Sequence, residues 1–330
     1  MPAANPHVMV AAGRRAALAW ISGGVLVAAV LVAVVLSRDL WLPVAVPVRD
    51  IEHVHGLAVD PRDPRILWVG THSGLVRVVD GLEWMRVGRA RYDMMGFTIV
   101  PGPSPYMVTS GHGGPTDRRP EPLGLERSRN GGRTWRTLAF AGRADFHALA
   151  VAPQNPAVLY AWSVGPRIGL YRSRTGGRQW DALGNRGLVD VYDLTVSPRD
   201  TALVFAATSR GLKMSADGGE TWRMADGFSA GISVTAVAIS RADPRVMYVY
   251  AMAPTIGLVR SDDRGATWVP TGLYLGKGDA VSNLALDPGR PRVLYIATYR
   301  GDVFHSSDGG VTRALWVKQG KVVGRTAESR

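Results

Sequence analysis

One eight-residue pattern recurs five times in this chain of 330 residues, and it restricts the possible folds more than any other feature. The copies start 42 to 46 residues apart, and each follows a strand-like segment such as GLERS or GLYRS. A degenerate sixth unit, GLVRVVDGLEW (74–84), precedes them. A period of this length indicates repeated copies of one supersecondary unit. The five copies are SRNGGRTW (128–135), SRTGGRQW (173–180), SADGGETW (215–222), SDDRGATW (261–268) and SSDGGVTR (306–313).

Each unit also carries an apolar strand, a proline turn and a second strand, as in HALAVAPQNPAVLYAWS. One unit therefore reads strand, turn, strand, loop, strand, turn, strand, which is typical of a β-propeller blade. The 39 glycines and 21 prolines favour short strands over long helices. The sequence predicts an all-β fold, a six-bladed propeller over residues 51–323 with a C-terminal tail at 324–330. Residues 44–50, VAVPVRD, can add to a sheet edge and help to close the ring.

The recurring turn has a physical logic. Serine hydroxyls and aspartate carboxylates accept hydrogen bonds from backbone amides of a turn, and glycine adopts positive φ freely. The tryptophan that begins the fourth strand buries a large apolar surface. We therefore expect a structural role for Ser128, Asn130, Ser173, Ser215, Asp217, Ser261, Asp263, Ser306 and Asp308.

These turns resemble the Asp-box, S/T-x-D-x-G-x-T-W, of the bacterial neuraminidase repeat superfamily. Asp217, Asp263 and Asp308 match its acidic position, whereas Asn130 and Thr175 depart from it and arginine replaces the aromatic in the last copy. The resemblance covers roughly residues 51–320. The superfamily includes sialidases, other glycoside hydrolases, sortilin-type receptors and photosystem II assembly factors. In all of them the box lies away from the active site, so function must be sought elsewhere.

The N-terminus predicts a membrane anchor. Residues 16–36 carry no charge, and a segment of this length can cross a bilayer as one helix. Arg14 and Arg15 precede it. We expect a cytoplasmic tail at 1–15, a transmembrane signal anchor at 16–37 and a linker at 38–50, with the propeller outside the cytoplasm at the cell membrane. A cleaved signal peptide and a twin-arginine export signal are the alternatives, but the apolar run is long for the first and the flanking residues fit the second poorly.

Composition limits the partners and the chemistry. The net charge is +12, but the arginines are scattered through turns, so we predict no nucleic-acid binding. Cysteine is absent, which excludes disulfides, thiolate metal sites and a cysteine nucleophile.

Polar residues occupy the positions expected to line the central channel. In a propeller the first strand of each blade lines the channel, and strand side chains alternate in direction. Alignment of the six first strands gives one column of His55, Met95, His147, Tyr192, Thr235 and Ser282. Two residues earlier the column reads His53, Asp93, Asp145, Asp190, Ser233 and Ala280.

The ends of the second strands are expected to reach the same mouth, and they carry His72 and His112. Five of the seven histidines therefore converge on the side of blades 1 to 3. Of the other two, His7 lies in the predicted cytoplasmic tail and His305 reads as a surface strand residue. A hydrogen-bonded structural plug is the alternative to a functional site.

Three functions fit these residues. The first is a copper or zinc site, because imidazole and carboxylate suit zinc while imidazole with thioether suits copper. Its candidate ligands are His53, His55, His72, His112, His147 and Met95, with Asp93 or Asp145 as a further ligand or as a partner that fixes the tautomer of a histidine.

The second function is glycoside hydrolysis, with Asp93, Asp145 and Tyr192 as catalytic candidates and Asp190 nearby. Sialidases hold the carboxylate of their sugar with three arginines, and neither channel column contains an arginine. We therefore expect no true sialidase activity.

The third function is binding of a small ligand, a glycan or a protein partner at the channel mouth, with the loop GGPTDRRPEPLG (113–124) as a lid or contact surface. A plain solvated insertion is the other interpretation of that loop. The sequence leaves the oligomeric state open. The set HVHGLAVDP, DMMGF, SGH and DFHALAV resembles bacterial extracytoplasmic Asp-box proteins that are commonly labelled glycosyl hydrolases or exo-sialidases.

Overall fold

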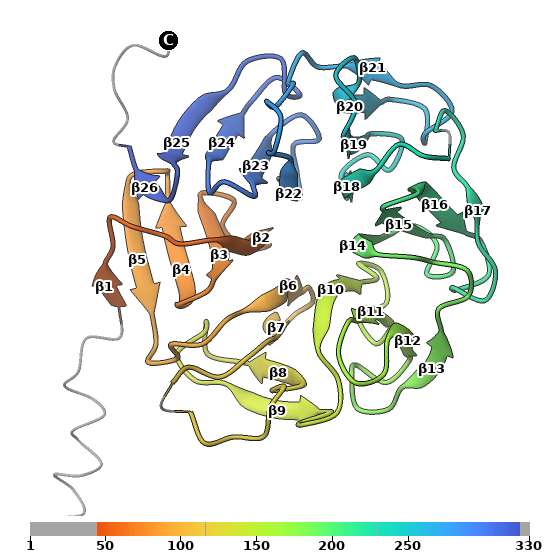
Figure 1. Cartoon of the computed structure of the whole chain (residues 1–330). Coiled ribbons are helices and arrows are strands. Elements are labelled where there is room, and N and C mark those ends of the chain that lie inside the picture. Colours follow the sequence, from red (N-terminus) through yellow and green to blue (C-terminus); the bar gives the residue numbers. More distant parts are fainter. Residues whose placement is uncertain (1–44, 116, 229, 324–330) are drawn as a thin grey trace, which may run out of the picture. The chain divides into compact units, whose positions relative to one another are not determined.

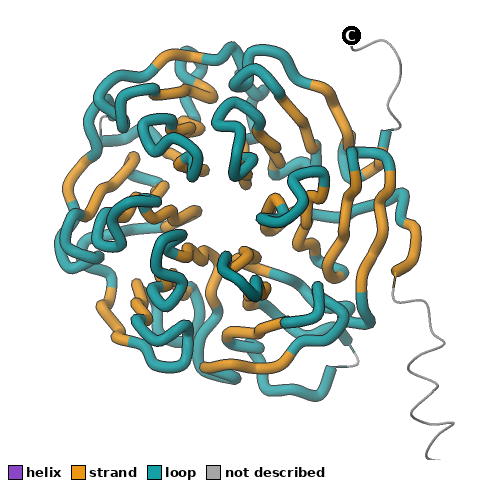
Figure 2. Tube along the Cα trace, turned by 180° about the vertical axis from the view of Figure 1, so that it is seen from behind, coloured by secondary structure: helices purple, strands orange, loops and turns teal. Residues whose placement is uncertain are grey.

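The computed structural model describes residues 45–323, except 116 and 229, as a six-bladed β-propeller. Figure 1 shows the six sheets arranged as a ring around a central channel, with β2, β6, β10, β14, β18 and β22 innermost. Figure 2 shows the ring from behind, where strands alternate with loops and turns throughout the described part. The predicted all-β, six-bladed fold is confirmed.

Every blade is an antiparallel sheet whose strands follow one another from the channel outward. Blade 1 holds β2 (Val54–Val59), β3 (Ile66–Thr71), β4 (Gly74–Val79) and β5 (Glu83–Val87); blade 2 holds β6 (Met95–Val100), β7 (Tyr106–Ser110), β8 (Leu125–Ser128) and β9 (Arg136–Ala139); blade 3 holds β10 (Phe146–Val151), β11 (Leu159–Ser163), β12 (Gly169–Ser173) and β13 (Asp181–Gly184). Blade 4 holds β14 (Val191–Val196), β15 (Val204–Thr208), β16 (Gly211–Ser215) and β17 (Arg223–Met224); blade 5 holds β18 (Val234–Ile239), β19 (Met247–Ala251), β20 (Gly257–Ser261) and β21 (Val269–Pro270); blade 6 holds β22 (Val281–Leu286), β23 (Leu294–Thr298), β24 (Val303–Ser306), β25 (Ala314–Lys318) and β26 (Lys321–Val322).

The hydrophobic core lies between the blades. Each described cluster of buried apolar side chains joins two neighbouring sheets, and the clusters follow one another around the ring. Val54, Met94, Phe146 and Val191 each lie in the sequence between two residues of the channel columns, and they are at most 4% exposed. The polar residues between them are thereby turned toward the channel.

The recurring turns join the third and fourth strands of blades 2 to 6, and one hydrogen-bond pattern holds them. In blade 4, Ser215 Oγ donates to Asp217 Oδ1 over 2.8 Å and accepts from the Gly219 amide over 2.8 Å. The same carboxylate oxygen accepts from the Thr221 amide over 2.9 Å. In blade 2, Asn130 replaces the aspartate in this role. These bonds are made within the turn itself.

The two ends of the described chain meet where blade 6 contacts blade 1. Strand β1 (Ala45–Pro47) pairs with β5 as the outer edge of blade 1, so part of the segment assigned to a linker belongs to the sheet. The Ile51 amide donates to the Gly320 carbonyl over 2.7 Å, and Asp50 forms a β-bridge with Lys321. These bonds close the ring.

The predicted cytoplasmic tail, membrane anchor and first part of the linker lie outside the described residues. Within residues 45–323, leaving aside 116 and 229, there is no helix with the length and apolar character needed to cross a bilayer.

Candidate metal centre at the channel mouth

A β-bulge lies near the start of the first strand in all six blades. The strand register shifts between Val54 and Gly56 in blade 1 and between Phe146 and Ala148 in blade 3. His55 and His147 are the extra residues at these two bulges. Bulges redirect side chains at the rims of sheets. Here they aim both imidazoles at the end of the channel where the first strands begin, which we call the channel mouth.

His55, His72 and Asp93 meet where blade 1 contacts blade 2, and we call this group triad 1. Asp93 lies 3.5 Å from His55 Nε2 through Oδ1 and 3.1 Å from His72 Nδ1 through Oδ2. The rings of His55 and His72 pack edge to face with their centres 4.4 Å apart. Burial, with added repulsion from His72, His53 and His147, lowers the pKa of His55 to about 3. Burial also raises the pKa of Asp93, against the opposing charge of His72. At neutral pH His55 is therefore an unprotonated ring that can act as a ligand.

His112, Asp145 and His147 meet where blade 2 contacts blade 3, and we call this group triad 2. Asp145 Oδ2 lies 3.1 Å from His112 Nε2 and 3.0 Å from His147 Nε2. On its other side, His112 Nδ1 lies 3.3 Å from Glu121 Oε2. Burial opposes the charged forms of His112 and Asp145, but their mutual attraction and hydrogen bonds outweigh it. The pKa of His112 is raised and that of Asp145 is lowered.

The two triads are built by the same contact between blades. In each, a histidine just beyond the second strand of one blade meets an aspartate just before the first strand of the next. Two hydrogen bonds between the blades fix these approaches: the Met94 amide donates to the Thr71 carbonyl, and the Phe146 amide donates to the side-chain hydroxyl of Ser110 over 3.0 Å. The equivalent residues between blades 3 and 4 are Val164 and Asp190. The imidazole is therefore replaced there by an apolar side chain.

The spacing of both triads suits a metal ion. On a four-coordinate zinc ion with bonds of about 2.0–2.2 Å, neighbouring donor atoms lie roughly 3.3–3.6 Å apart. The carboxylate–imidazole pairs lie 3.0 to 3.5 Å apart, and all donor atoms of a triad lie within 4.8 Å of one another. His55 Nε2, Asp93 Oδ1 and Asp145 Oδ1 are buried and lack a hydrogen-bond partner. Buried polar atoms without partners are costly, and a bound cation would satisfy them.

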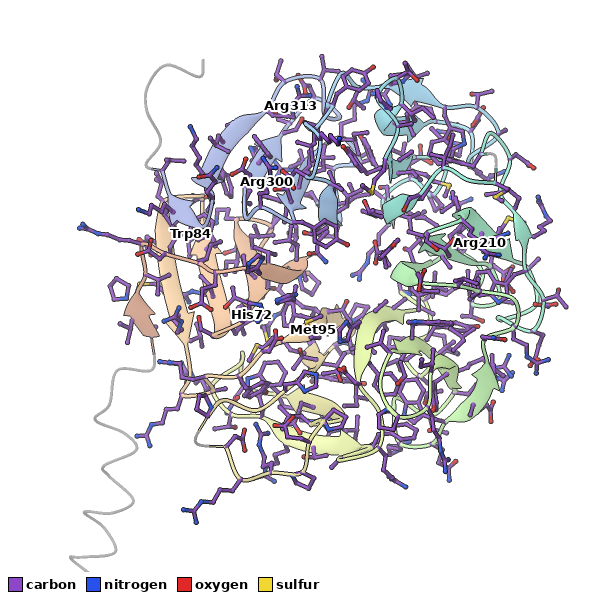
Figure 3. The ribbon with its side chains drawn as sticks, in the orientation of Figure 1. His72, Trp84, Met95, Arg210, Arg300 and Arg313 are labelled. Atoms are coloured by element: carbon purple, nitrogen blue, oxygen red, sulfur yellow. The ribbon has the colours of Figure 1, made fainter. Side chains whose placement is uncertain are left out.

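A cavity of about 540 Å³ opens beside the triads, and we call it the mouth cavity. His55 of triad 1 and His147 of triad 2 both line it, together with His53 and Met95. Figure 3 labels Met95 and His72 where blades 1 and 2 meet at the channel. The other lining residues are mainly apolar or aromatic and come from blades 1, 3, 4 and 6: Val54, Trp162, Val164, Ile168, Asp190, Val191, Tyr192, Ser282, Asn283 and Tyr299.

The structure thus brings together the five histidines and both aspartates of the sequence prediction. His53 is not a member of either triad, but its ring centre lies 5.4 Å from that of His72. Tyr192 lines the apolar side of the mouth cavity and is 39% exposed. Thr235 differs from expectation: it is buried and donates to the Val281 carbonyl over 2.6 Å, so it does not contribute to the mouth.

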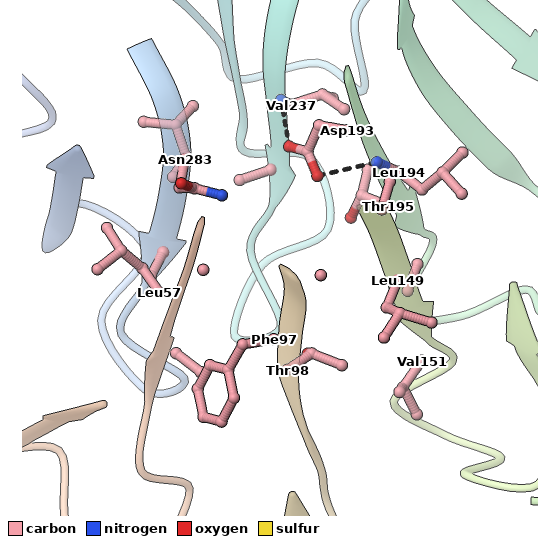
Figure 4. Close-up of a pocket in the computed structure, with 18 of the residues that line it drawn as sticks. Leu57, Phe97, Thr98, Leu149, Val151, Asp193, Leu194, Thr195, Val237 and Asn283 are labelled. Carbon is pink, nitrogen blue, oxygen red and sulfur yellow. Dashed lines mark hydrogen bonds between the residues drawn. The ribbon is translucent and has the colours of Figure 1, made fainter. Parts of the chain in front are cut away.

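Sequence reasoning missed two residues. Glu121, in the loop 113–124, binds the Gly113 amide as well as His112, so the loop is tied to triad 2 rather than plainly solvated. Asp193 lies deeper, in a channel cavity of about 170 Å³, where it accepts from the Val237 amide over 3.0 Å and the Leu194 amide over 2.8 Å (Figure 4). Its signal was a charge inside an inner strand where the other blades place glycine, alanine or asparagine.

The stability of the fold should depend on pH through Asp193. Burial raises the pKa of this carboxyl to about 7, so the folded protein keeps a proton that the unfolded chain releases near pH 4. The free energy of unfolding should therefore fall between about pH 4 and pH 7, by at most about 1.4 kcal/mol per pH unit, and then level off. Urea denaturation of the wild type and of Asp193→Asn at several pH values isolates this contribution. A difference between the two proteins that stays constant with pH would contradict it.

Comparisons with known proteins support the fold. No protein-family model matches the sequence, and a search of curated proteins found no match. A GH74 enzyme of Niastella koreensis is similar, with a TM-score of 0.56 and 17% identity over 82% of this chain and 46% of that one. The GH74 xyloglucanase of Xanthomonas campestris gives a TM-score of 0.55 and 18% identity over 83% and 46%. The extracellular domain of a proposed one-component system from B. thetaiotaomicron gives 0.56 and 11% over 86% and 36%. The chain spans less than half the length of these structures, and the likeness is one of fold.

Proposed function

We propose that this protein is a membrane-anchored, extracytoplasmic Asp-box propeller that binds a transition-metal ion at its channel mouth. The observation that carries the proposal is triad 2, in which one donor atom each of His112, His147 and Asp145 lies within 4.8 Å of the others. Two imidazoles and one carboxylate suit zinc and also copper. Anchoring through residues 16–37 and the extracytoplasmic location rest on the sequence alone.

The surroundings of triad 2 favour a metal ligand over a plain hydrogen-bonded plug. A histidine that binds metal through one ring nitrogen commonly donates from the other to a carboxylate, which fixes its tautomer and orientation. Glu121 is placed for this role, because it faces His112 Nδ1 while His112 Nε2 faces Asp145. Arg119 holds the same loop down through Asp117 and the buried Glu126. The loop therefore presents Glu121 from a fixed position.

Metal binding is tested with the purified full chain. After incubation with zinc or copper and dialysis, the wild type should retain metal, measured by mass spectrometry. His147→Ala should lower the affinity of triad 2 by at least about 100-fold, since loss of a ligand has a larger effect than loss of a group that only hydrogen-bonds to a ligand. His305→Ala is the matched control, because it removes a histidine that lies in β24 of blade 6. A wild type that retains neither metal would refute the proposal.

Carbohydrate-directed chemistry is the second candidate, and the mouth cavity favours it. Trp162, Tyr192 and Tyr299 offer aromatic faces, and Ser282 Oγ and Asn283 Oδ1 are buried without hydrogen-bond partners. Apolar walls with a few converging polar groups are typical of small-ligand sites. The fold likeness to GH74 enzymes adds weight. Hydrolysis of chromogenic glycosides by chelator-treated protein, lost in Asp145→Asn, would support this candidate, and no activity across the panel would argue against it.

A further inference from the structure

We infer that the channel mouth binds two metal ions, one in each triad. This inference rests on the proposed function and extends it from one site to a pair. Among the described residues, the His, Asp and Glu donor atoms that lie within 4.8 Å of one another at the mouth form two groups, and these groups share no residue. One ion held by all five histidines would require a mixed group, and none is present in this part of the chain.

Triad 1 has the features of a site in its own right. His55 lies at the bulge of β2, His72 follows the end of β3, and Asp93 precedes the first strand of blade 2. Backbone hydrogen bonds on both blades fix these positions. His55 Nε2 and Asp93 Oδ1 lie 3.5 Å apart, both buried, and neither has a hydrogen-bond partner. A plug held together by hydrogen bonds would not leave two facing donor and acceptor atoms unpaired. A cation between them would satisfy both.

The repeat of the fold explains why there are two sites. The contact that joins His72 to Asp93 recurs one blade later as the contact that joins His112 to Asp145. The third ligand is the extra residue of a bulge, His55 in blade 1 and His147 in blade 3, whereas in blade 2 Met95 pairs with Ser110 and the register shifts after it. Both His55 and His147 line the mouth cavity, so both ions would be open to it. Three protein ligands leave a four-coordinate ion one free position.

The test is the metal content of the full chain with zinc as the probe. The wild type should bind two equivalents, and His72→Ala and His112→Ala should each bind one. The double variant should bind none. Two peaks of anomalous scattering at the zinc edge in crystals of the wild type give a second measurement that needs no variant.

The outcomes separate this inference from the proposed function. A wild type with one equivalent, unchanged in His72→Ala and lost in His112→Ala, would overturn the second ion and leave the proposed function standing. A wild type without zinc or copper would remove both. If His72→Ala fails to fold, judged by its circular dichroism, the anomalous peaks decide: one peak overturns the inference and two support it.

Discussion

Replacing Phe146 with alanine is expected to lower the free energy of unfolding by about 3–5 kcal/mol. Phe146 is fully buried between blades 2 and 3, where it stacks on Trp180 and meets Phe140 and Tyr171 edge to face. Deletion of the ring removes these contacts and leaves a cavity that antiparallel sheets on both sides can fill only in part. Urea denaturation followed by tryptophan fluorescence measures the loss.

The same substitution should disturb the channel mouth. Phe146 stands between Asp145 and His147 in the sequence, so its ring anchors the segment that presents two ligands of triad 2. Ile168→Ala, at a residue of blade 3 that is 67% exposed, is the control and should stay within about 0.5 kcal/mol of the wild type. The loss in the free energy of unfolding for Phe146→Leu should lie between those of Phe146→Ala and Ile168→Ala. A loss below 1 kcal/mol in Phe146→Ala would show that the blades do not depend on this contact.

The fold could be predicted because its determinants are local. The recurring turn is specified within eight residues, and in every copy the serine hydroxyl accepts a hydrogen bond from the amide of the glycine four residues later. Apolar alternation in the first strands also lies within one strand, and Val54 and Phe146 are buried as it requires. Ring closure by β1 and the C-terminal segment depends on long-range pairing, so the sequence offered it only as an option.

The site could be predicted only in outline. The alternation of side chains along the first strands predicts that His55 and His147 face the channel. It does not predict which aspartate each histidine contacts, because that contact depends on how far one blade is displaced along the next. The division into two triads follows from that displacement and from the bulges. Thr235 shares the bulge column, yet a hydrogen bond to the neighbouring blade turns it away from the mouth. Glu121 could not be predicted, because it lies in a loop whose path no periodic sequence pattern specifies.

Asp145→Asn should weaken metal binding at triad 2 by at least about 100-fold. Asparagine keeps the shape of the side chain but removes the negative charge, and a neutral amide oxygen is a poorer ligand for zinc than a carboxylate. Asp145 is also 6% exposed and lies beside both imidazoles, so its replacement deprives His112 and His147 of their shared partner. Zinc titration against a chromophoric chelator, carried out in a His72→Ala background, isolates triad 2 from triad 1.

Asp190→Asn is the matched control for this experiment. Asp190 is an exposed residue that lines the same mouth cavity but belongs to neither triad, and its φ of 46° is one that asparagine adopts readily. Like Asp145→Asn, the Asp190→Asn substitution removes one negative charge at the mouth cavity. It should leave the zinc affinity within about threefold of the starting protein, since exposed charges interact weakly across water. Equal losses in the two variants would mean that the mouth attracts zinc through its general negative potential. A large loss in Asp145→Asn alone assigns the zinc to triad 2, where Asp145 contacts both imidazoles, because the control removes the same charge at the same channel mouth.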